Sequence, residues 1–244
     1  MEQTAYIEMD ATEANHWWFR GRRAILQHYL QTMQLPTTAR ILEIGAGTGG
    51  NLSLLQRHGK VTAVEMDPAA RAMALRKTDG NVTILAGRYP DDLPINDARF
   101  DLVCMFDVLE HIEDDDAALH ALHHLLLPGG RVLLTVPAYP WMWSSHDTSL
   151  HHKRRYQRSA LAQKIQAAGL CIHRLTHFNT LLFPLAALAR LKDKATNSQT
   201  ASGTGIPPQP VNEMFRMLFS AERHLLQHID LPFGLSLLAV ITSR

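Results

Sequence analysis

The fold of this chain is decided by the stretch Arg40-Ile-Leu-Glu-Ile-Gly-Ala-Gly-Thr-Gly-Gly50. It begins with a short run of apolar, partly β-branched residues, which is typical of a buried strand. Glycines at 45, 47, 49 and 50 then let the backbone turn sharply and approach a ligand closely. Residues 51–58 favour a helix, whose free N–H groups would point toward that ligand. The stretch therefore predicts a strand, a ligand-binding glycine loop and a helix.

A second strand is predicted from Val61 to Val64, and it ends at the acid Glu65. A carboxylate in this position can accept hydrogen bonds from ribose hydroxyls. The loop fits either a dinucleotide or a cationic cofactor. The glycines at 45, 47 and 50 match the dinucleotide pattern G-x-G-x-x-G. Glu43 favours a cationic cofactor over a dinucleotide, since a carboxylate attracts a cationic ligand and repels a pyrophosphate. A tight turn that binds nothing is the remaining interpretation.

The composition excludes several classes of protein. Hydrophobic residues make up 46% of the 244, enough for a substantial core, and a net charge of +1 gives no field that attracts nucleic acid. The two cysteines, Cys104 and Cys171, indicate reduced thiols rather than a disulfide framework. Residues 1–10 carry no secretory signal, and no apolar stretch reaches the roughly 20 residues that span a bilayer. We therefore expect a cytoplasmic protein without a nucleic-acid partner.

Strands and helices alternate along the rest of the chain. Residues 12–32 predict a helix with Trp17-Trp18-Phe19 near its start, and Arg22 or Arg23 of that helix is placed to reach a carboxylate at the ligand site. Helices are predicted from Pro68 and from Asp114 to Leu127. Further strands are predicted at 81–86, 100–106 and 131–136. The alternation predicts an α/β fold with a doubly wound, Rossmann-like, mostly parallel sheet.

Four motifs occur in the order and spacing of a known family: Leu42-Glu-Ile-Gly-Ala-Gly-Thr-Gly49, Phe100-Asp-Leu-Val103, Asp107-Val-Leu-Glu-His-Ile112 and Leu127-Pro-Gly-Gly130. Together they resemble the class I S-adenosylmethionine (SAM) dependent methyltransferases, of the broad group that includes quinone-ring O-methyltransferases. The resemblance covers about residues 12–171. It implies a seven-stranded sheet with an antiparallel last strand, here residues 234–242, and in-line methyl transfer from SAM to a small molecule. A non-catalytic SAM-binding protein and a NAD-type oxidoreductase are the alternatives.

The resemblance also implies where the cofactor binds. Many of these enzymes place an acid after the third strand to hold the adenine amino group. This chain has Arg88 there, so the backbone, or Asp91 and Asp92 further into the loop, would make that contact. The residues expected to bind SAM are Glu43, Gly45, Ala46, Gly47, Gly49, Glu65, Met66, Arg88 and Asp107.

His111 is the first candidate for a catalytic base, because it follows the fourth strand at the cofactor edge and can titrate near neutrality. His152, from a later loop, is the second catalytic candidate. With Asp107 and Glu110, the two histidines resemble the acid-acid-His-His set of some metal-dependent O-methyltransferases, whose divalent ion would lower the pKa of an acceptor hydroxyl. A histidine that only fixes a loop is the other interpretation, so the metal stays open.

The acceptor is expected beyond the fifth strand, because open α/β sheets bind ligands at the carboxyl ends of their strands. Residues 137–143 and 151–156 leave that end. Paired guanidinium groups there would hold an anionic acceptor such as a phosphate or a carboxylate. Alternatively, these basic residues lie exposed to solvent at the start of a helix and bind no ligand. The substrate-binding candidates are Trp143, Arg154, Arg155 and Tyr156.

The chain is predicted to have three parts: a SAM-binding core with its N-terminal helix at 1–177, a helical excursion at 178–233, and the last strand at 234–244. In the excursion, Pro184 is expected to break an apolar run, and residues 192–210 are predicted to form a mobile polar linker. We expect the excursion to cap the acceptor site, and peripheral contact with a membrane is the alternative. The acceptor is expected to be lipid-linked or quinone-like. A helical stripe follows at Val211, Met214, Phe215, Leu218, Phe219, Leu225, Leu226 and Ile229.

Overall fold

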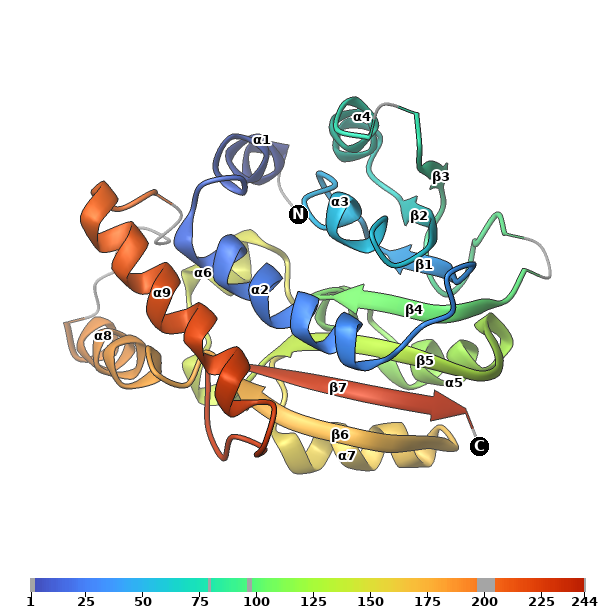
Figure 1. The fold of residues 1–244 in the computed structure, drawn as a ribbon. Coiled ribbons are helices and arrows are strands. Elements are labelled where there is room, and N and C mark those ends of the chain that lie inside the picture. The colour runs from blue at the N-terminus through green and yellow to red at the C-terminus, as the bar shows by residue number, and fades with distance from the viewer. Residues whose placement is uncertain (1–2, 79, 96–97, 197–204, 244) are drawn as a thin grey trace.

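A single sheet of seven strands organises the computed structural model, which describes residues 3–78, 80–95, 98–196 and 205–243 (Figure 1). The strand order is β3-β2-β1-β4-β5-β7-β6, and only β7 runs antiparallel to its neighbours. The doubly wound fold and its antiparallel last strand are thus confirmed. The strands are β1 Arg40–Ile44, β2 Lys60–Glu65, β3 Thr83–Ala86, β4 Phe100–Phe106, β5 Leu126–Pro137, β6 Leu170–Phe178 and β7 Ser236–Ser243.

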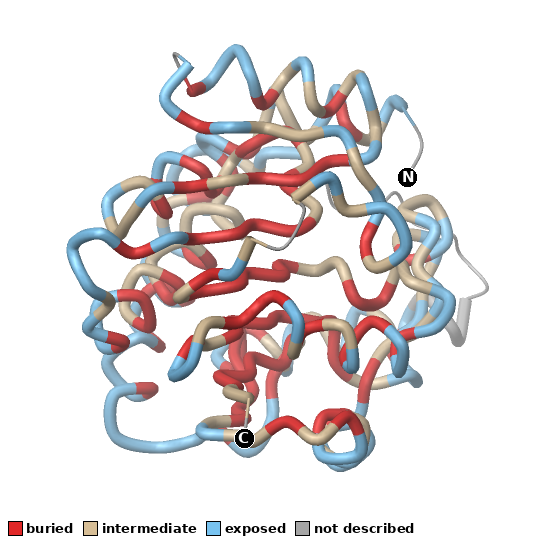
Figure 2. Tube along the Cα trace, turned by 90° about the vertical axis from the view of Figure 1, so that its right-hand side faces the viewer, coloured by how far each residue is buried: buried red, intermediate tan, exposed pale blue. Residues whose placement is uncertain are grey.

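Helices cover both faces of the sheet (Figure 1). One face carries α2 (Trp17–Thr32), α3 (Leu52–Leu55) and α9 (Gln209–Leu225), and the other carries α5 (Asp115–Leu125) and α7 (Arg158–Ala167). Each helix on the sheet buries one apolar stripe, as α2 does with Ile25, Leu26, Tyr29 and Leu30. Because both faces are covered, the central strands are almost wholly apolar, and Figure 2 shows buried stretches running through the middle of the molecule.

The first part of the chain forms two helices where the sequence predicted one. Helix α1 (Gln3–Thr12) ends before α2 begins, and His16 caps α2 by accepting a hydrogen bond from the Trp18 N–H at 3.2 Å. A side-chain acceptor at this position satisfies an N–H group that the helix leaves free. Helix α3 is also shorter than the predicted range 51–58.

The excursion differs from its prediction in two ways. Pro184 does not break the apolar run, because it lies in the first turn of α8 (Phe183–Thr196), where proline is tolerated. The stripe predicted on α9 is only partly buried: Phe219 is inaccessible to solvent, whereas Met214 and Leu218 are exposed. Helix α8 occupies the start of the predicted linker and α9 begins at Gln209, while residues 197–204 lie outside the described residues.

Helix α9 is held against α2 by aromatic packing. The rings of Trp17 and Phe215 lie 5.5 Å apart, and an added Cβ at Gly21 would collide with the ring of Phe219. Glycine at position 21 therefore lets the two helices approach closely. In the described part of the chain, no helix has both the length and the apolar character needed to cross a membrane.

Candidate functional site

A cavity of about 1660 Å³ opens at the carboxyl ends of the parallel strands. Its walls come from α1, α2, the glycine loop, the end of β4, the loops after β4 and β5, and α8. Pockets for one drug-sized ligand are commonly about 300–1,000 Å³. The cavity is therefore large enough for two ligands side by side, such as a cofactor and an acceptor.

The glycine loop forms one end of the cavity, and Glu65 holds it in shape. The N–H of Gly47 donates to Oε2 of Glu65 at 2.7 Å, and the N–H of Asp67 donates to Oε1 at 2.8 Å. Gly47 has a φ of +55°, and an added Cβ would meet nothing within 4 Å, so its backbone faces open space. The predicted residues that line this end are Gly45, Ala46, Gly47, Glu65, Met66 and Arg88.

Two predicted cofactor residues lie behind the loop, outside the set of residues that line the cavity. Gly49 packs against α4 (Pro68–Arg76), where an added Cβ would come within 2.9 Å of Cα of Ala74. Glu43 is 1% exposed and accepts a hydrogen bond from Nδ2 of Asn51 at 3.2 Å. Burial raises the pKa of Glu43 to about 8. Neither residue lines the cavity in this structure, so the contact of Glu43 and Gly49 with a cofactor stays a prediction.

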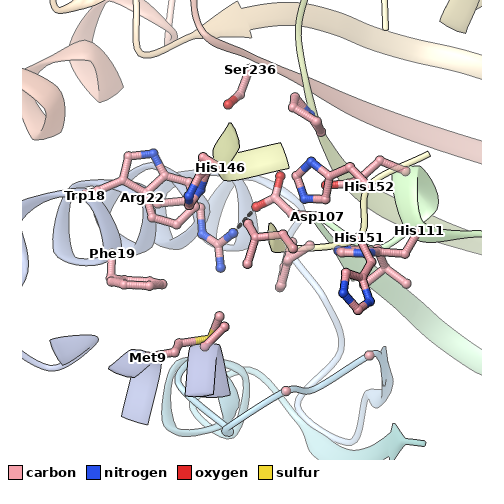
Figure 3. Close-up of a pocket in the computed structure, with 18 of the residues that line it drawn as sticks. Met9, Trp18, Phe19, Arg22, Asp107, His111, His146, His151, His152 and Ser236 are labelled. Atoms are coloured by element: carbon pink, nitrogen blue, oxygen red, sulfur yellow. Dashed lines mark hydrogen bonds and ion pairs between the residues drawn. The ribbon is translucent and has the colours of Figure 1, made fainter. Parts of the chain in front are cut away.

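An ion pair crosses the cavity from α2 to the end of β4. Figure 3 shows the guanidinium of Arg22 reaching the carboxylate of Asp107, and the Arg22 guanidinium also lies 4.6 Å from the ring centroid of Trp18. Asp107 has a φ of +57°, in the left-handed region that costs energy for a residue with a side chain. Both side chains line the cavity, and contact of Asp107 with a cofactor stays a prediction.

Glu110, His111 and His152 form a tight cluster at the other end of the cavity. One ligand atom from each lies within 4.8 Å of the others, and the two imidazole rings are 4.7 Å apart (Figure 3). Glu110 is fully buried with neither carboxylate oxygen hydrogen-bonded, and burial raises its pKa well above its usual value. Burial and the nearby His152 lower the pKa of His111 to about 3. Asp107 pairs with Arg22 and stays outside the cluster.

Asp147 is the residue that the sequence analysis did not identify as functional. It is inaccessible to solvent, and its Oδ1 lies 3.0 Å from Nδ1 of His152 and 2.7 Å from Nε of Arg155. Burial opposes ionisation, but the hydrogen bonds from these two side chains hold its pKa well below the usual value. An ionised carboxylate accepts, so Nδ1 of His152 carries the proton and its Nε2 is left as the free acceptor.

The predicted acceptor wall is largely internal structure. Arg154 pairs with Asp115 at 2.6 Å, and the hydroxyl of Tyr156 donates to the same carboxylate at 2.8 Å. Neither side chain lines the cavity, and Trp143 does not line it either. Arg155 lines the cavity but is already engaged by Asp147. The expectation of two guanidinium groups open to an anionic acceptor is therefore wrong, because buried acids from other elements neutralise both.

The N-terminal helix α1 is a second feature that the sequence analysis missed. Met9 and Glu13 line the cavity from α1 and the turn after it, and Glu13 packs directly over Gly50 of the glycine loop. Glu13 also forms an ion pair with Lys77 after α4. The signal was weak, because residues 1–10 lack a pronounced apolar stripe and only Tyr6 of α1 is buried.

The chain matches known proteins along most of its length. The family described as "Methyltransferase domain" matches residues 16–195. The ubiquinone biosynthesis O-methyltransferase of Pseudomonas aeruginosa (strain LESB58) is 30% identical over 138 residues, which cover 50% of this chain and 58% of that protein. A probable S-adenosylmethionine-dependent methyltransferase of Mycolicibacterium smegmatis is 26% identical, covering 63% of this chain and 59% of that protein. The chain thus spans less than two thirds of these curated relatives.

Solved structures share the fold. A chain from the complex between the Haloferax volcanii Trm112 methyltransferase activator and the putative methyltransferase has a TM-score of 0.64 and 21% identity, covering 98% of this chain and 95% of that one. Phosphoethanolamine N-methyltransferase 2 of Haemonchus contortus, solved with S-adenosyl-L-methionine, has a TM-score of 0.57 and 17% identity, covering 90% of this chain and 52% of that one. At these identities the likeness concerns the fold alone.

Proposed function

The chain belongs to the family of methyltransferase domains, and we propose that it transfers a methyl group from SAM to a hydroxyl of a small-molecule acceptor. The observation that carries this proposal is one cavity that joins the Gly47–Glu65 loop to His152. A loop for a nucleoside and a histidine positioned by a carboxylate, at opposite ends of one cavity, are the parts that such a reaction needs. Relatives named as O-methyltransferases support the same reaction class.

The residues around the loop fit SAM. Gly47 offers an open backbone, and the carboxylate of Glu65 lies where ribose hydroxyls would donate to it. Arg22 and Asp107 present opposite charges to the cavity, which suits the carboxylate and ammonium of the amino-acid end. When bound, SAM supplies the electrophilic methyl group. Holding it in line with the acceptor oxygen is the main contribution of these residues.

We assign the general base to His152 rather than to His111. His152 has its Nδ1 bonded to Asp147, which fixes the ring and leaves Nε2 to accept the hydroxyl proton. His111 has its pKa lowered to about 3, so it is a weak proton acceptor near neutrality. Its neutral ring suits a role in orienting the acceptor or in binding a metal.

Glu110, His111 and His152 also fit a divalent cation. A buried carboxylate with two unbonded oxygens beside two imidazoles supplies oxygen and nitrogen ligands, and the Asp147–His152 hydrogen bond is the kind that orients a metal-binding histidine. Such an ion would lower the pKa of an acceptor hydroxyl. We propose the cation as an alternative to the histidine base, because Nε2 of His152 cannot bind an ion and accept a proton at the same time.

The acceptor is proposed to be a polar ring or head with an apolar extension, such as a lipid-linked molecule. The histidine end of the cavity is polar, whereas α8 contributes Leu182, Leu185, Ala186 and Ala189 to the adjoining wall. An anionic group on the acceptor would meet Arg190 and Lys192, which line the cavity on the same helix. Peripheral contact with a membrane follows from such a substrate.

Two measurements test the proposal. Isothermal titration should show binding of SAM and no comparable binding of NAD, since Asp107 in the cavity would attract the ammonium group of SAM and repel a pyrophosphate. Incubation of lysate metabolites with the protein and methyl-labelled SAM, followed by mass spectrometry, should then reveal a labelled O-methyl product. Tight SAM binding without a product across hydroxyl, carboxyl and amine acceptors would instead identify a non-catalytic SAM-binding protein.

A further inference from the structure

Helix α8 turns its leucines away from the protein. Leu185, Leu188 and Leu191 are 56%, 65% and 55% exposed, and Leu181 just before the helix is 45% exposed. The opposite side, with Ala186 and Arg190, is partly buried. A surface helix of a globular protein normally has the reverse arrangement, with its apolar stripe inward.

Helix α9 buries Phe219 against α2, but it also exposes apolar side chains. Met214 and Met217 are 45% and 57% exposed, whereas Asn212 and Glu222 are buried. Asn212 accepts the N–H of Trp17 at 2.8 Å, and one carboxylate oxygen of Glu222 accepts the N–H of Leu181 at 2.8 Å. The second bond ties α9 to the segment that leads into α8. Helices α8 and α9 thus both expose large apolar side chains, and α9 buries polar residues as well.

We call the exposed apolar residues of α8, of α9 and of the segments beside them the α8–α9 face. Figure 1 shows both helices at the same end of the molecule. The ring of Phe183, at the start of α8, lies 6.4 Å from Trp141 and 5.6 Å from Phe233, which are both 41% exposed. An exposed apolar surface of this kind indicates an interaction site. Its other members are Leu181, Leu185, Leu188, Leu191, Val211, Met214, Met217, Leu218 and Leu225.

We propose that the α8–α9 face docks onto a lipid bilayer that contains anionic headgroups. Lys192 is exposed on α8 and Arg223 is exposed on α9, whereas Arg190 lies on the partly buried side of α8 and Arg216 pairs with Glu213. The acids among the described side chains of the two helices are Glu213, which pairs with Arg20 and Arg216, and the buried Glu222. This positive surplus complements anionic headgroups and disfavours a second copy of the same face.

The shape of the face agrees with a position in the plane of the membrane. Neither helix meets the length and hydropathy needed to cross a bilayer, in the part of the chain that the structure describes. A helix with an apolar side and a basic border instead lies at the boundary of headgroups and acyl chains. Exposed tryptophan beside such a surface suits the same boundary.

The face continues into the cavity along α8. Leu185 is exposed and lines the cavity, together with Leu182 and Ala189 on the neighbouring side of the helix. A membrane-dissolved acceptor could therefore pass along α8 from the bilayer to the histidine cluster. This last step rests on the proposed methyl transfer, whereas membrane docking does not.

The test uses the full chain and flotation with lipid vesicles. The wild-type protein should float with vesicles of phosphatidylcholine and phosphatidylglycerol, and more weakly with phosphatidylcholine alone. The double variant Leu188→Glu/Met217→Glu should lose at least about tenfold in partitioning, because both changes put carboxylates on the apolar face away from the cavity. Leu75→Glu is the matched control, since Leu75 is 47% exposed on the distant helix α4.

Each outcome decides the matter. No flotation of the wild type, or equal flotation of the double variant and the wild type, contradicts the docking. Equal binding to both vesicle types contradicts the anionic headgroup, and a dimer that Leu188→Glu/Met217→Glu dissociates would assign the face to a second copy. Calorimetric SAM binding, measured without vesicles, and circular dichroism accompany every variant. Absence of SAM binding in the calorimeter would contradict the proposed function, whereas absence of flotation would contradict only the docking.

Discussion

Asp147 and His152 form a buried carboxylate–imidazole pair, with 3.0 Å between Oδ1 and Nδ1. They are five positions apart in the chain, with Asp147 inside α6 (Ser145–Ser149) and His152 after it, so the pair is formed by the local path of the backbone. Asp147 is further fixed by the N–H of Ser144 at 2.9 Å, in a capping box at the start of α6. The histidine at the end of the cavity is therefore held by a carboxylate that is itself anchored.

Asp147→Asn should lower kcat with little change in KM. The amide can present its N–H to Nδ1 of His152, which would put the proton on Nε2 and remove the acceptor that faces the cavity. Loss of a positioned base typically costs about 10²–10⁴-fold in rate. Steady-state kinetics with a hydroxyl acceptor measure the effect, and the double variant with His152→Gln should be no slower than His152→Gln alone.

Asp115→Asn is the control for Asp147→Asn. Asp115 is also a buried acid with cationic partners, Arg154 and Lys164, but it does not line or support the histidine cluster. Its replacement should lower the free energy of unfolding while leaving kcat near the wild-type value. Equal kcat losses in the two variants would mean that Asp147 acts only on stability.

Gly47→Val should abolish SAM binding with only a modest loss of stability. The side chain would enter the cavity at the point where the backbone faces open space. Gly129→Val carries the same backbone strain, because Gly129 also has a positive φ and open space around it, and it lies outside the cavity. Calorimetry of both variants isolates the steric effect, and wild-type affinity in Gly47→Val would make the loop purely structural.

Glu65→Ala should weaken SAM binding by roughly 2 kcal/mol, the scale of hydrogen bonds to a charged group. The carboxylate would no longer accept from the ribose, and the N–H of Gly47 would lose its partner at 2.7 Å. Glu65→Gln keeps an acceptor oxygen and should have an intermediate dissociation constant. An unchanged constant in Glu65→Ala, with the fold intact by circular dichroism, would contradict the ribose assignment.

Glu43 should make the ligand-free protein less stable as pH rises. Its pKa is raised from 4.5 to about 8, so the folded state holds a proton that the unfolded state has released between these values. This loss of stability is absent below pH 4.5. Between pH 4.5 and pH 8 the free energy of unfolding falls by at most about 1.4 kcal/mol per pH unit. Glu43→Gln should flatten this part of the profile. Urea unfolding at several pH values measures both, and identical slopes would remove Glu43 as the cause.

The sequence allowed the glycine loop and the sheet to be predicted because their signals are local. Gly47 and Glu65 lie on adjoining elements of one strand–helix–strand unit, so their meeting follows from the fold. Arg154 was misassigned for the opposite reason. Its partner Asp115 comes from a distant helix, and a run of basic residues does not reveal that buried acids neutralise it.

The role of Asp147 and the orientation of α8 were not predicted, for related physical reasons. The role of Asp147 depends on a turn that brings His152 and Arg155 back to it, which no periodic pattern indicates. The apolar run containing Pro184 was correctly recognised as unusual, but apolar character alone does not tell which side of a helix faces the protein.

The pair of Arg22 and Asp107 has a consequence for the exchange of ligands. The amino-acid group of SAM carries one carboxylate and one ammonium. As the ligand enters, Arg22 could pair with its carboxylate and Asp107 with its ammonium in place of their mutual ion pair. When the ligand leaves, the two side chains can meet again, and neither is left as an isolated charge in a partly buried place. The net attraction is then the difference between two sets of ion pairs. Such a site would bind its ligand with moderate affinity and would allow the product to dissociate, which suits repeated turnover.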